Sequence, residues 1–215
     1  MPRMLFSKIG RAVWMSHLDL MRLMQRAFRR AGVILHHSQG FTPHAYVSIL
    51  LPLSVGMESV CEIMEYELDE PLAITPEDMN AVLPEGVRVL RVYEGGRKLR
   101  ELTHLSALLR LEYDTGVPQG AAQAVTELLG GTSLIVEKRT KRGMEPTDLR
   151  PLLKAAALTQ SGDALELRCT VCAQNPSLNP MLLATAVERY LPQYRPDGVS
   201  CRRLEVLDAE GKVFR

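Results

Sequence analysis

Arginines and histidines gather in one stretch of the chain, residues 16–52, which holds four of the five histidines. It also holds four arginines that recur at helical spacing, namely Arg22, Arg26, Arg29 and Arg30. A guanidinium group binds phosphate oxygens through forked, bidentate hydrogen bonds, and a row of such groups can bind successive phosphates of a nucleic acid. We therefore predict that these arginines bind RNA. The alternatives are a solvated helix face, or a face packed against the acidic segment 62–70.

The histidines of this stretch could carry a second kind of chemistry, because neutral imidazole binds metal ions and imidazolium binds anions. His36 and His37 are adjacent in an expected strand and point to opposite faces, so at most one of them joins the other histidines. No acid or cysteine stands beside them in the sequence to complete a closed site, and we predict no bound metal. If the chain is an enzyme, it would cleave RNA by general acid and base catalysis or by metal-assisted hydrolysis. The catalytic candidates are then His17, His37 and His44.

The segment 38–44, with the sequence SQGFTPH, is predicted to be the turn of a β-hairpin. Gly40 is expected to take a positive φ in this turn. Backbone N–H groups and polar side chains of the turn could bind a small group. The candidate loop site is formed by Ser38, Gln39, Gly40, Phe41 and His44.

A helix is predicted to present the arginines. Ser16 followed by Asp19 has the spacing of a helix N-cap, and Gly32 marks the end of a helix that begins at His17. At 100° per residue the arginines share one arc, and an inward arc lies opposite them. The inward arc is made by His17, Leu20, Met21, Met24, Ala27, Phe28 and Ala31. Trp14, just before the helix, is also expected in the core.

The order of strand and helix patterns predicts an α+β protein with two tandem ferredoxin-like domains, each a split β-α-β arrangement with an antiparallel sheet. The domains are expected at 1–95 and 105–215. In the first domain we expect strands around 3–15, 33–37, 46–53, 61–69 and 87–92, with helices at 17–31 and 75–83. In the second domain we expect strands at 107–113, 133–138, 165–172 and 199–207, with helices at 119–129 and 180–191.

The second domain is also expected to carry a mobile basic loop at 138–151, followed by a turn at Asp148 and Arg150. Four bases of this loop could extend the RNA-binding surface: Lys138, Arg139, Lys141 and Arg142.

Composition and charge limit the class of protein. The chain is 46% hydrophobic and 24% charged, and it has no apolar run near the roughly 20 residues that a membrane span needs. Residues 1–60 carry seven Lys or Arg against two Asp or Glu, whereas residues 61–85 carry eight acids and no base. The N-terminus lacks the pattern of a secretory signal, and the single CxxC, Cys169 and Cys172, is interpreted as part of the core. We expect a cytoplasmic protein with reduced thiols.

Short motifs recur together along the chain: F-S-K-x-G at 6–10, S-H-L-D at 16–19, R-A-x-R-R-A-G at 26–32, S-x-G-F-x-P-H at 38–44 and P-L-x-V-G-x-E-S at 52–59. A looser K…G…D-L-R-P pattern follows at 138–151. By these motifs nearly the whole chain resembles the radical-SAM-linked proteins, a bacterial family of unknown function. That family usually has P-H-P followed by a basic residue, whereas this chain continues from His44 with Ala45 and Tyr46.

The resemblance implies a partner and not an activity. Members are encoded beside, or fused to, a radical SAM enzyme, often near RNA-processing and ribosomal genes. This chain has no CxxxCxxC motif that could bind an iron–sulfur cluster, so the partner would supply the radical chemistry. We therefore predict a non-catalytic accessory protein, without a cofactor of its own, that binds RNA and docks onto a radical SAM enzyme. The alternatives are the histidine-dependent enzyme described above and a pure protein–protein adaptor.

Overall fold

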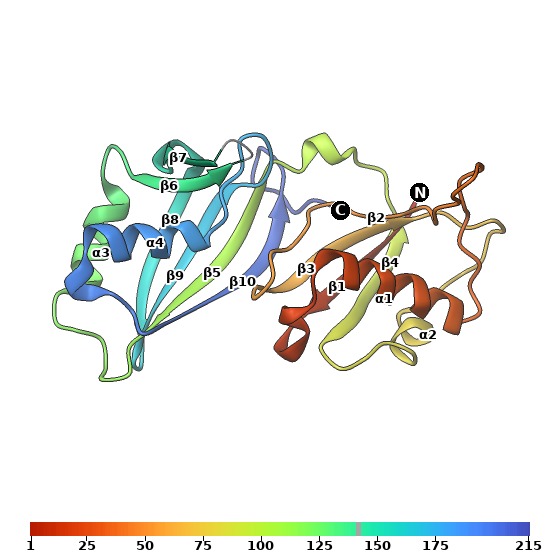
Figure 1. Ribbon diagram of the computed structural model, residues 1–215, viewed down its shortest axis with the longest axis horizontal. Helices are drawn as coiled ribbons and strands as arrows, with labels where there is room; N and C mark the ends of the chain where they lie inside the picture. The colour runs from red at the N-terminus through yellow and green to blue at the C-terminus, as the bar shows by residue number, and fades with distance from the viewer. Residues whose placement is uncertain (141–142) are drawn as a thin grey trace. The chain divides into compact units, whose positions relative to one another are not determined.

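A computed structural model describes residues 1–140 and 143–215 of the chain (Figure 1). The chain divides into two compact units, Met1–Leu99 with Arg215, and Arg100–Phe214. Each unit combines antiparallel strands with a few helices, so the protein is α+β as predicted. The domain limits expected from the sequence, 1–95 and 105–215, stay a prediction.

The first unit has four strands and two α-helices in the order β-α-β-β-α-β among its described residues. Its elements are β1 (Pro2–Lys8), the 3-10 helix η1 (Gly10–Trp14), α1 (His17–Arg30), β2 (Val47–Ile49), β3 (Glu58–Tyr66), α2 (Pro76–Asn80) and β4 (Val87–Glu94). The strands lie in the order β4-β1-β3-β2, and all neighbours are antiparallel. Each helix therefore connects two strands that have a third strand between them, which is the split β-α-β arrangement.

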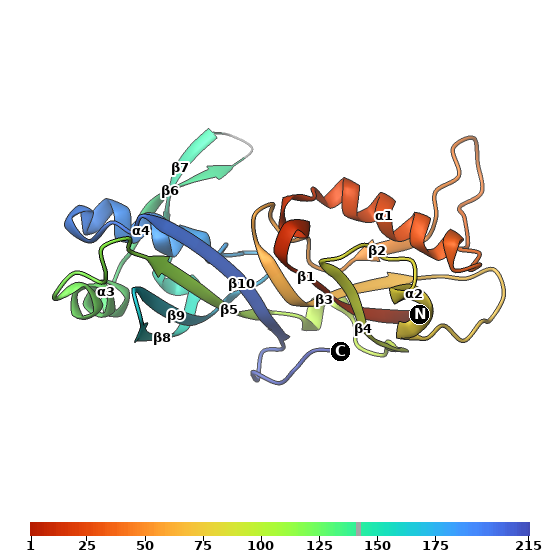
Figure 2. The ribbon, with the colours of Figure 1, turned by 90° about the horizontal axis from the view of Figure 1, so that it is seen from below.

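Helix α1 covers one face of this sheet (Figure 2). Its buried residues are Leu20, Met24, Ala27 and Phe28, which lie on the predicted inward arc. They pack in one hydrophobic cluster with side chains of β1, β3 and β4. Within the cluster the rings of Phe28 and Tyr66 lie 5.0 Å apart, centroid to centroid, in a tilted arrangement. Because these four residues of the inward arc pack in the core, the opposite arc of α1 faces away from the sheet.

The second unit repeats the same strand order with an insertion. Its elements are β5 (His104–Glu112), α3 (Ala121–Gly130), β6 (Ile135–Thr140), β7 (Gly143–Asp148), β8 (Leu153–Ser161), β9 (Ala164–Cys172), α4 (Met181–Tyr190) and β10 (Gly198–Leu207), with short 3-10 helices η2 (Leu99–Glu101), η3 (Arg150–Leu152) and η4 (Pro192–Tyr194). Four strands lie in the order β10-β5-β9-β8, again antiparallel, whereas β6 and β7 form a separate two-stranded sheet.

The structure corrects the prediction for residues 133–161. The described part of the expected mobile loop at 138–151 includes the second strand of a hairpin, because β7 pairs with β6 along its length. The predicted strand at 133–138 belongs to this hairpin, and β8, which was not predicted, takes its place at the edge of the main sheet. The sequence of β8, LKAAALTQS, lacks apolar alternation, so its strand state depends on pairing with β9. Lys141 and Arg142 lie outside the described residues.

Three smaller predictions for the first unit also need correction. The strand expected at 3–15 ends at Lys8, and the 3-10 helix η1 follows it. Trp14, expected in the core, has 73% of its surface exposed. The strand expected at 33–37 is reduced to two isolated bridges, made by Leu35 and His37. By contrast, Thr75 forms the predicted cap of α2, as part of a full capping box with Asp78.

Candidate nucleic-acid interface

The start of α1 is fixed by a cap. The Ser16 hydroxyl accepts a hydrogen bond from the Asp19 N–H at 3.2 Å and donates one to Asp19 Oδ2 at 2.6 Å. The hydroxyl hydrogen bond, more than any other contact, holds the pKa of the Asp19 carboxyl below its ordinary value. A charged carboxylate at this end also suits the positive end of the helix dipole. The predicted N-cap is therefore confirmed.

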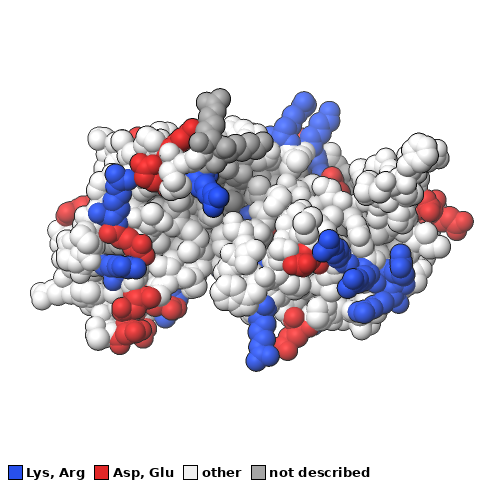
Figure 3. Space-filling view, in the orientation of Figure 1, with Lys and Arg blue, Asp and Glu red and all other residues white. Residues whose placement is uncertain are grey.

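The four arginines of α1 are all exposed and share its outward arc, as predicted. We call Arg22, Arg26, Arg29 and Arg30 the arginine ridge. Figure 3 shows them as one group of cationic side chains over α1. Arg22 lies 3.8 Å from Asp19, and both side chains are largely exposed. In the described part of the chain no other carboxylate pairs with the ridge, so most of its charge is available to a ligand.

The acidic segment 62–70 does not neutralise the ridge. Glu65 accepts two hydrogen bonds from the buried Arg3, at 2.9 and 2.6 Å. Asp69 Oδ1 lies 2.6 Å from His36 Nδ1. These acids pair within the sheet and the following loop. The alternative in which the ridge packs against the acidic segment is therefore not seen.

One hollow is lined by a residue of the ridge, Arg29, and by one of the histidines that follow α1, His37. It has a volume of about 210 Å³ and is lined by Gln25, Arg29, Val33, Ile34, Leu35, His37 and Ala45. His37 Nδ1 lies 2.8 Å from the Leu35 carbonyl oxygen, which can only accept, so Nδ1 carries the proton. His37 Nε2 is then the ring nitrogen left for a ligand. In the neutral ring Nε2 only accepts, so Arg29 and His37 can bind one anionic group from two sides when His37 is imidazolium, in which both ring nitrogens donate.

The loop 38–44 projects beyond the end of α1 (Figure 2). Its base is closed by the Ser38 N–H, which donates to the His44 carbonyl at 2.9 Å, and by the His44 N–H, which donates to Ser38 Oγ at 3.0 Å. Gly40 has φ +138°, so its predicted positive φ is confirmed. Gln39 and Phe41 are exposed. The Ser38 hydroxyl thus holds the turn, and the exposed tip residues are the ones that a ligand can reach.

The structure does not bring the three candidate catalytic histidines to one point. His17 begins α1, twelve residues before Arg29, which is roughly 18 Å along a helix axis. His37 lines the hollow beside Arg29, whereas His44 lines another hollow with Tyr46 and Glu65. In residues 1–140 and 143–215 no cluster of three His, Cys, Asp or Glu side chains is placed to hold a metal ion.

Sequence reasoning missed the pair formed by His36 and Asp69. The two side chains are partly exposed, 33 positions apart in the chain, and 2.6 Å apart in space. The His36 ring also stacks on Tyr46, with centroids 5.2 Å apart. The bridge between Leu35 and Leu68 brings their two segments side by side, and no local sequence pattern indicates this pairing.

A second missed feature is the apolar end of the outward arc. Trp14 is 73% exposed and Leu18 is 64% exposed. Leu18 precedes Arg22 and Arg26 at intervals of four residues, so it belongs to the arginine side of the helix. That spacing was a usable signal in the sequence. The outward surface therefore begins with apolar side chains and continues with guanidinium groups.

Two of the four bases predicted to bind RNA in the second unit lie within the described residues. Lys138 is half-buried, and its ammonium donates to the Ser177 carbonyl oxygen at 2.9 Å. Arg139, next to it on β6, is exposed. The other two predicted bases, Lys141 and Arg142, lie outside the described residues.

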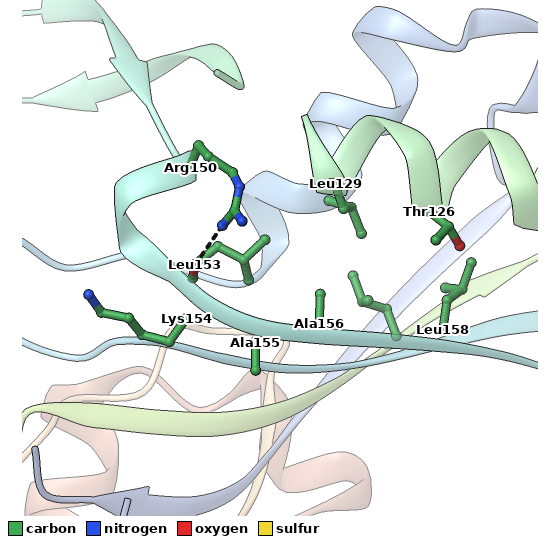
Figure 4. A pocket seen from close by; sticks show the side chains of 10 residues that line it. Thr126, Leu129, Arg150, Leu153, Lys154, Ala155, Ala156 and Leu158 are labelled. Atoms are coloured by element: carbon green, nitrogen blue, oxygen red, sulfur yellow. Dashed lines mark hydrogen bonds between the residues drawn. The ribbon is translucent and has the colours of Figure 1, made fainter. Parts of the chain in front are cut away.

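A hollow of about 240 Å³ lies between α3 and β8 in the second unit (Figure 4). Its lining is mostly aliphatic, and two of its polar side chains, Arg150 and Thr126, form hydrogen bonds within the fold. Arg150 donates to the carbonyl oxygens of Gly131 and Leu153, both at 3.0 Å. Thr126 Oγ1 donates to the Ala122 carbonyl oxygen at 2.8 Å. This hollow offers mainly apolar contact, and Lys154 is the charged residue of its lining for which no hydrogen bond or ion pair is seen within the described residues.

Comparison with protein families shows the family to which the chain belongs. Residues 2–180 match the model of an uncharacterized protein family conserved in bacteria (DUF2344), and the chain belongs to this family. No curated protein sequence matches it. None of the described helices is long and apolar enough to span a membrane.

Two solved structures match most of the chain, and one of them resembles its fold. A chain of a Cbf5-Nop10-Gar1 complex matches with a TM-score of 0.52 at 12% identity, over 95% of this chain and 48% of that one. This protein thus spans about half the length of that chain, and the likeness concerns the fold alone. An unknown protein from Galdieria sulphuraria matches at 12% identity over 94% of this chain and 96% of that one, with a TM-score of only 0.26.

Proposed function

We propose that the protein is a non-catalytic accessory protein of the cytoplasm that binds RNA through the arginine ridge and docks onto a radical SAM enzyme. We infer further that its two units are tandem ferredoxin-like domains. The observation that carries the RNA proposal is the exposed ridge on α1, of which only Arg22 approaches a carboxylate in the described part of the chain. Four such cations on one helix face form an electrostatic footprint for a polyanion.

The spacing of the ridge suits a chain of phosphates better than a single small anion. From Arg22 to Arg30 the helix rises roughly 12 Å, so the guanidinium groups are spread along the axis. Binding would release condensed counterions, and its affinity would fall steeply with salt. Contacts to phosphates fix the orientation of the RNA on the protein, but by themselves they do not discriminate between base sequences. The ridge accounts for affinity, and a partner or a further contact must supply selectivity.

The docking half of the proposal is supported by the motifs shared with radical-SAM-linked proteins. The chain has four cysteines, and no three of them have the spacing of a cluster-binding motif. The buried Cys169 and Cys201 thiols have pKa values raised to about 12 by burial, which opposes thiolate ligation. A radical reaction on bound RNA would therefore need a second protein.

The RNA proposal is tested by measuring the affinity of labelled RNA by fluorescence anisotropy at several salt concentrations. The double variant Arg26→Glu, Arg30→Glu should bind more weakly. Removing two phosphate contacts should also lower the slope of log K against log salt by about 1.4, at about 0.7 per contact for a single strand. The matched control is Arg88→Glu, Arg91→Glu on β4. Both side chains are exposed, and each arginine is next in sequence to a core residue on the helix-covered face of the sheet. Because adjacent residues of a strand point to opposite faces, the two arginines project from the face without the helix.

Equal losses in both double variants would mean that RNA responds to net charge, and would remove the ridge from the proposal. Absence of salt-dependent binding by the unmodified protein would overturn the RNA half altogether. The docking half is tested by mixing the purified protein with the radical SAM enzyme of the same organism and following a complex by size-exclusion chromatography. A stable complex without RNA binding would instead support a protein–protein adaptor.

One observation favours an RNA-cleaving enzyme as the second candidate, namely the contact of His36 with Asp69. A carboxylate at 2.6 Å can orient an imidazole for general acid and base catalysis. Discrete cleavage products from end-labelled RNA, abolished by His36→Ala and retained in His17→Ala, would favour this candidate over the accessory role.

A further inference from the structure

Trp14 is the only tryptophan of the chain, and its side chain is directed to solvent. It closes the 3-10 helix η1 immediately before the Ser16 cap of α1. Large aromatic side chains dominate protein cores, and a tryptophan this exposed contributes little to one. The fold therefore leaves the role of this indole unexplained.

The backbone that carries Trp14 is well anchored on both sides. Ala12 is buried, and Met15 packs against the core of the first unit. Between them the Val13 carbonyl oxygen accepts hydrogen bonds from Lys8 Nζ at 3.0 Å and from the Gly56 N–H at 2.9 Å. The residue beside the Trp14 ring is Gly56, which has no side chain. A Cβ atom built on Gly56 would lie 3.8 Å from Trp14 Cζ3. The indole is thus presented from a fixed frame.

The surroundings of Trp14 combine apolar surface with cationic charge. Leu18 and Val55 are also largely exposed, and Arg11 in η1 adds a further exposed cation. The ridge then follows along α1. An exposed apolar group that directly precedes the helix of the arginine ridge suits a ligand that carries both flat apolar faces and negative charge. Nucleic acid bases joined by phosphates have this combination.

We propose that Trp14 is a stacking platform for an unpaired base of single-stranded RNA whose phosphates lie along the arginine ridge. This inference rests on the proposed RNA binding and names the class of RNA. A base in a duplex is stacked on its neighbours and cannot present its face to a side chain, whereas a single strand can splay a base onto an aromatic ring. The ridge accepts phosphates of either form, and Trp14 selects the single strand.

The single tryptophan makes the test direct. Titration with an unstructured single-stranded oligoribonucleotide should quench the tryptophan fluorescence, because the base covers the indole. A fully paired duplex of equal length should bind through the ridge with little quenching. Free N-acetyltryptophanamide mixed with each RNA corrects for absorption of light by the nucleic acid.

Three substitutions of the same residue separate stacking from apolar contact, with affinities measured by anisotropy of labelled RNA. Trp14→Ala should weaken single-strand binding by roughly five- to one-hundred-fold, the range for one stacked base, and leave duplex binding unchanged. Trp14→Phe keeps an aromatic face and should restore most of the affinity. Trp14→Leu keeps apolar surface without an aromatic face and should behave as Trp14→Ala does. Since the side chain is exposed, all three should keep the wild-type unfolding temperature.

Failure of this inference is distinguishable from failure of the proposed function. If the unmodified protein binds no RNA, the proposed function fails and takes the inference with it. If RNA binds through the ridge but single-strand affinity is equal in wild type and Trp14→Ala, only the stacking platform is overturned. If Trp14→Ala instead abolishes self-association or the complex with the radical SAM enzyme while RNA affinity stays unchanged, Trp14 belongs to a protein interface and the inference is wrong.

Discussion

Arg29 and His37 line the same hollow, although the end of α1 lies between them. Gly32, with φ +75°, reverses the chain there. The Gly32 N–H donates to the Arg29 carbonyl oxygen at 3.1 Å and the Val33 N–H donates to the Phe28 carbonyl oxygen at 2.9 Å, which is the hydrogen-bond pattern of a Schellman motif. This motif directs the following segment back along the helix. The ridge residue Arg29 and His37 thereby come to line one hollow.

Because both side chains face one hollow, their contributions to RNA binding should be coupled. We expect Arg29→Ala and His37→Ala each to weaken binding, and the double variant to lose less than the sum. A coupling energy of about 0.5 to 3 kcal/mol is expected for groups that bind the same phosphate. The measurement is a double-mutant cycle of RNA affinity at constant salt.

The control cycle pairs His37 with Arg22, which lies seven residues before Arg29 and does not line the hollow. In this control cycle the losses of binding free energy in the two single variants should add up to the loss in the double variant, to within about 0.5 kcal/mol, as expected for separate sites. Additivity in both cycles would mean that His37 and Arg29 do not share a ligand group.

Gly32 should be needed for both stability and placement of the hollow. Gly32→Ala forces a Cβ into the left-handed region, at a cost of about 1 to 2 kcal/mol in the free energy of unfolding. A Cβ there would meet no atom within 4 Å, so the cost is conformational. The matched control is Gly130→Ala at the end of α3, where space is also open and φ is not positive. That change should stabilise by about 0.5 kcal/mol.

Urea unfolding of the two glycine variants measures both expected changes in the free energy of unfolding, a decrease for Gly32→Ala and an increase for Gly130→Ala. A stabilising effect of Gly32→Ala would contradict the role assigned to the left-handed turn. RNA affinity measured on the same samples should fall for Gly32→Ala and stay unchanged for Gly130→Ala, because only the first change displaces His37 relative to Arg29.

Local sequence signals made helix α1, which presents the arginine ridge, predictable. The Ser16 cap, the helical spacing of the arginines and Gly32 each depend on residues close in sequence, and α1 has the predicted bounds to within one residue. The inward arc was predictable for the same reason, because a helix repeats every 3.6 residues. The exposure of Trp14 was not predictable from local signals, because it depends on a turn into η1 that separates the indole from the core.

Long-range pairing explains what the sequence could not predict. Strand β8 contains Ala155, Ala156 and Ala157 in succession, which has neither the period of a strand nor strong β propensity. Its state comes from pairing with β9, for example Leu158 opposite Leu167. The contact between His36 and Asp69 likewise requires that two remote segments already lie side by side.

Asp148 should stabilise the second unit in a pH-dependent way. Its carboxylate accepts hydrogen bonds from the N–H groups of Leu134 at 2.7 Å and Arg150 at 3.0 Å, and from the Ser133 hydroxyl at 3.0 Å. The N–H bond from Leu134, followed by that from Arg150, lowers the pKa of Asp148 below its ordinary value. The D-L-R-P motif thus joins β6, β7 and β8. We expect Asp148→Asn to lower the unfolding free energy at neutral pH.

The sign of the pH effect follows from that lowered pKa. The unfolded chain takes up the proton first as pH falls, so the stabilisation is complete above the ordinary pKa and is lost as pH drops through the folded one. The difference in unfolding free energy between wild type and Asp148→Asn should be constant above about pH 5 and shrink below it. A difference that grows on acidification would contradict the assignment.

The four cysteines should differ sharply in reactivity. Burial raises the pKa of the Cys169 and Cys201 thiols to about 12, so little thiolate exists at pH 8, and both side chains are inaccessible. Cys61 is also buried, whereas Cys172 is half-buried. Since the thiolate is the reactive form, a thiol reagent such as DTNB should modify Cys172 first and the other three only on unfolding. Cys172→Ser should abolish the fast phase, and mass spectrometry should identify the modified residue. Fast modification of Cys169 in the folded protein would show that β9 opens readily, and would contradict the core role assigned to this residue.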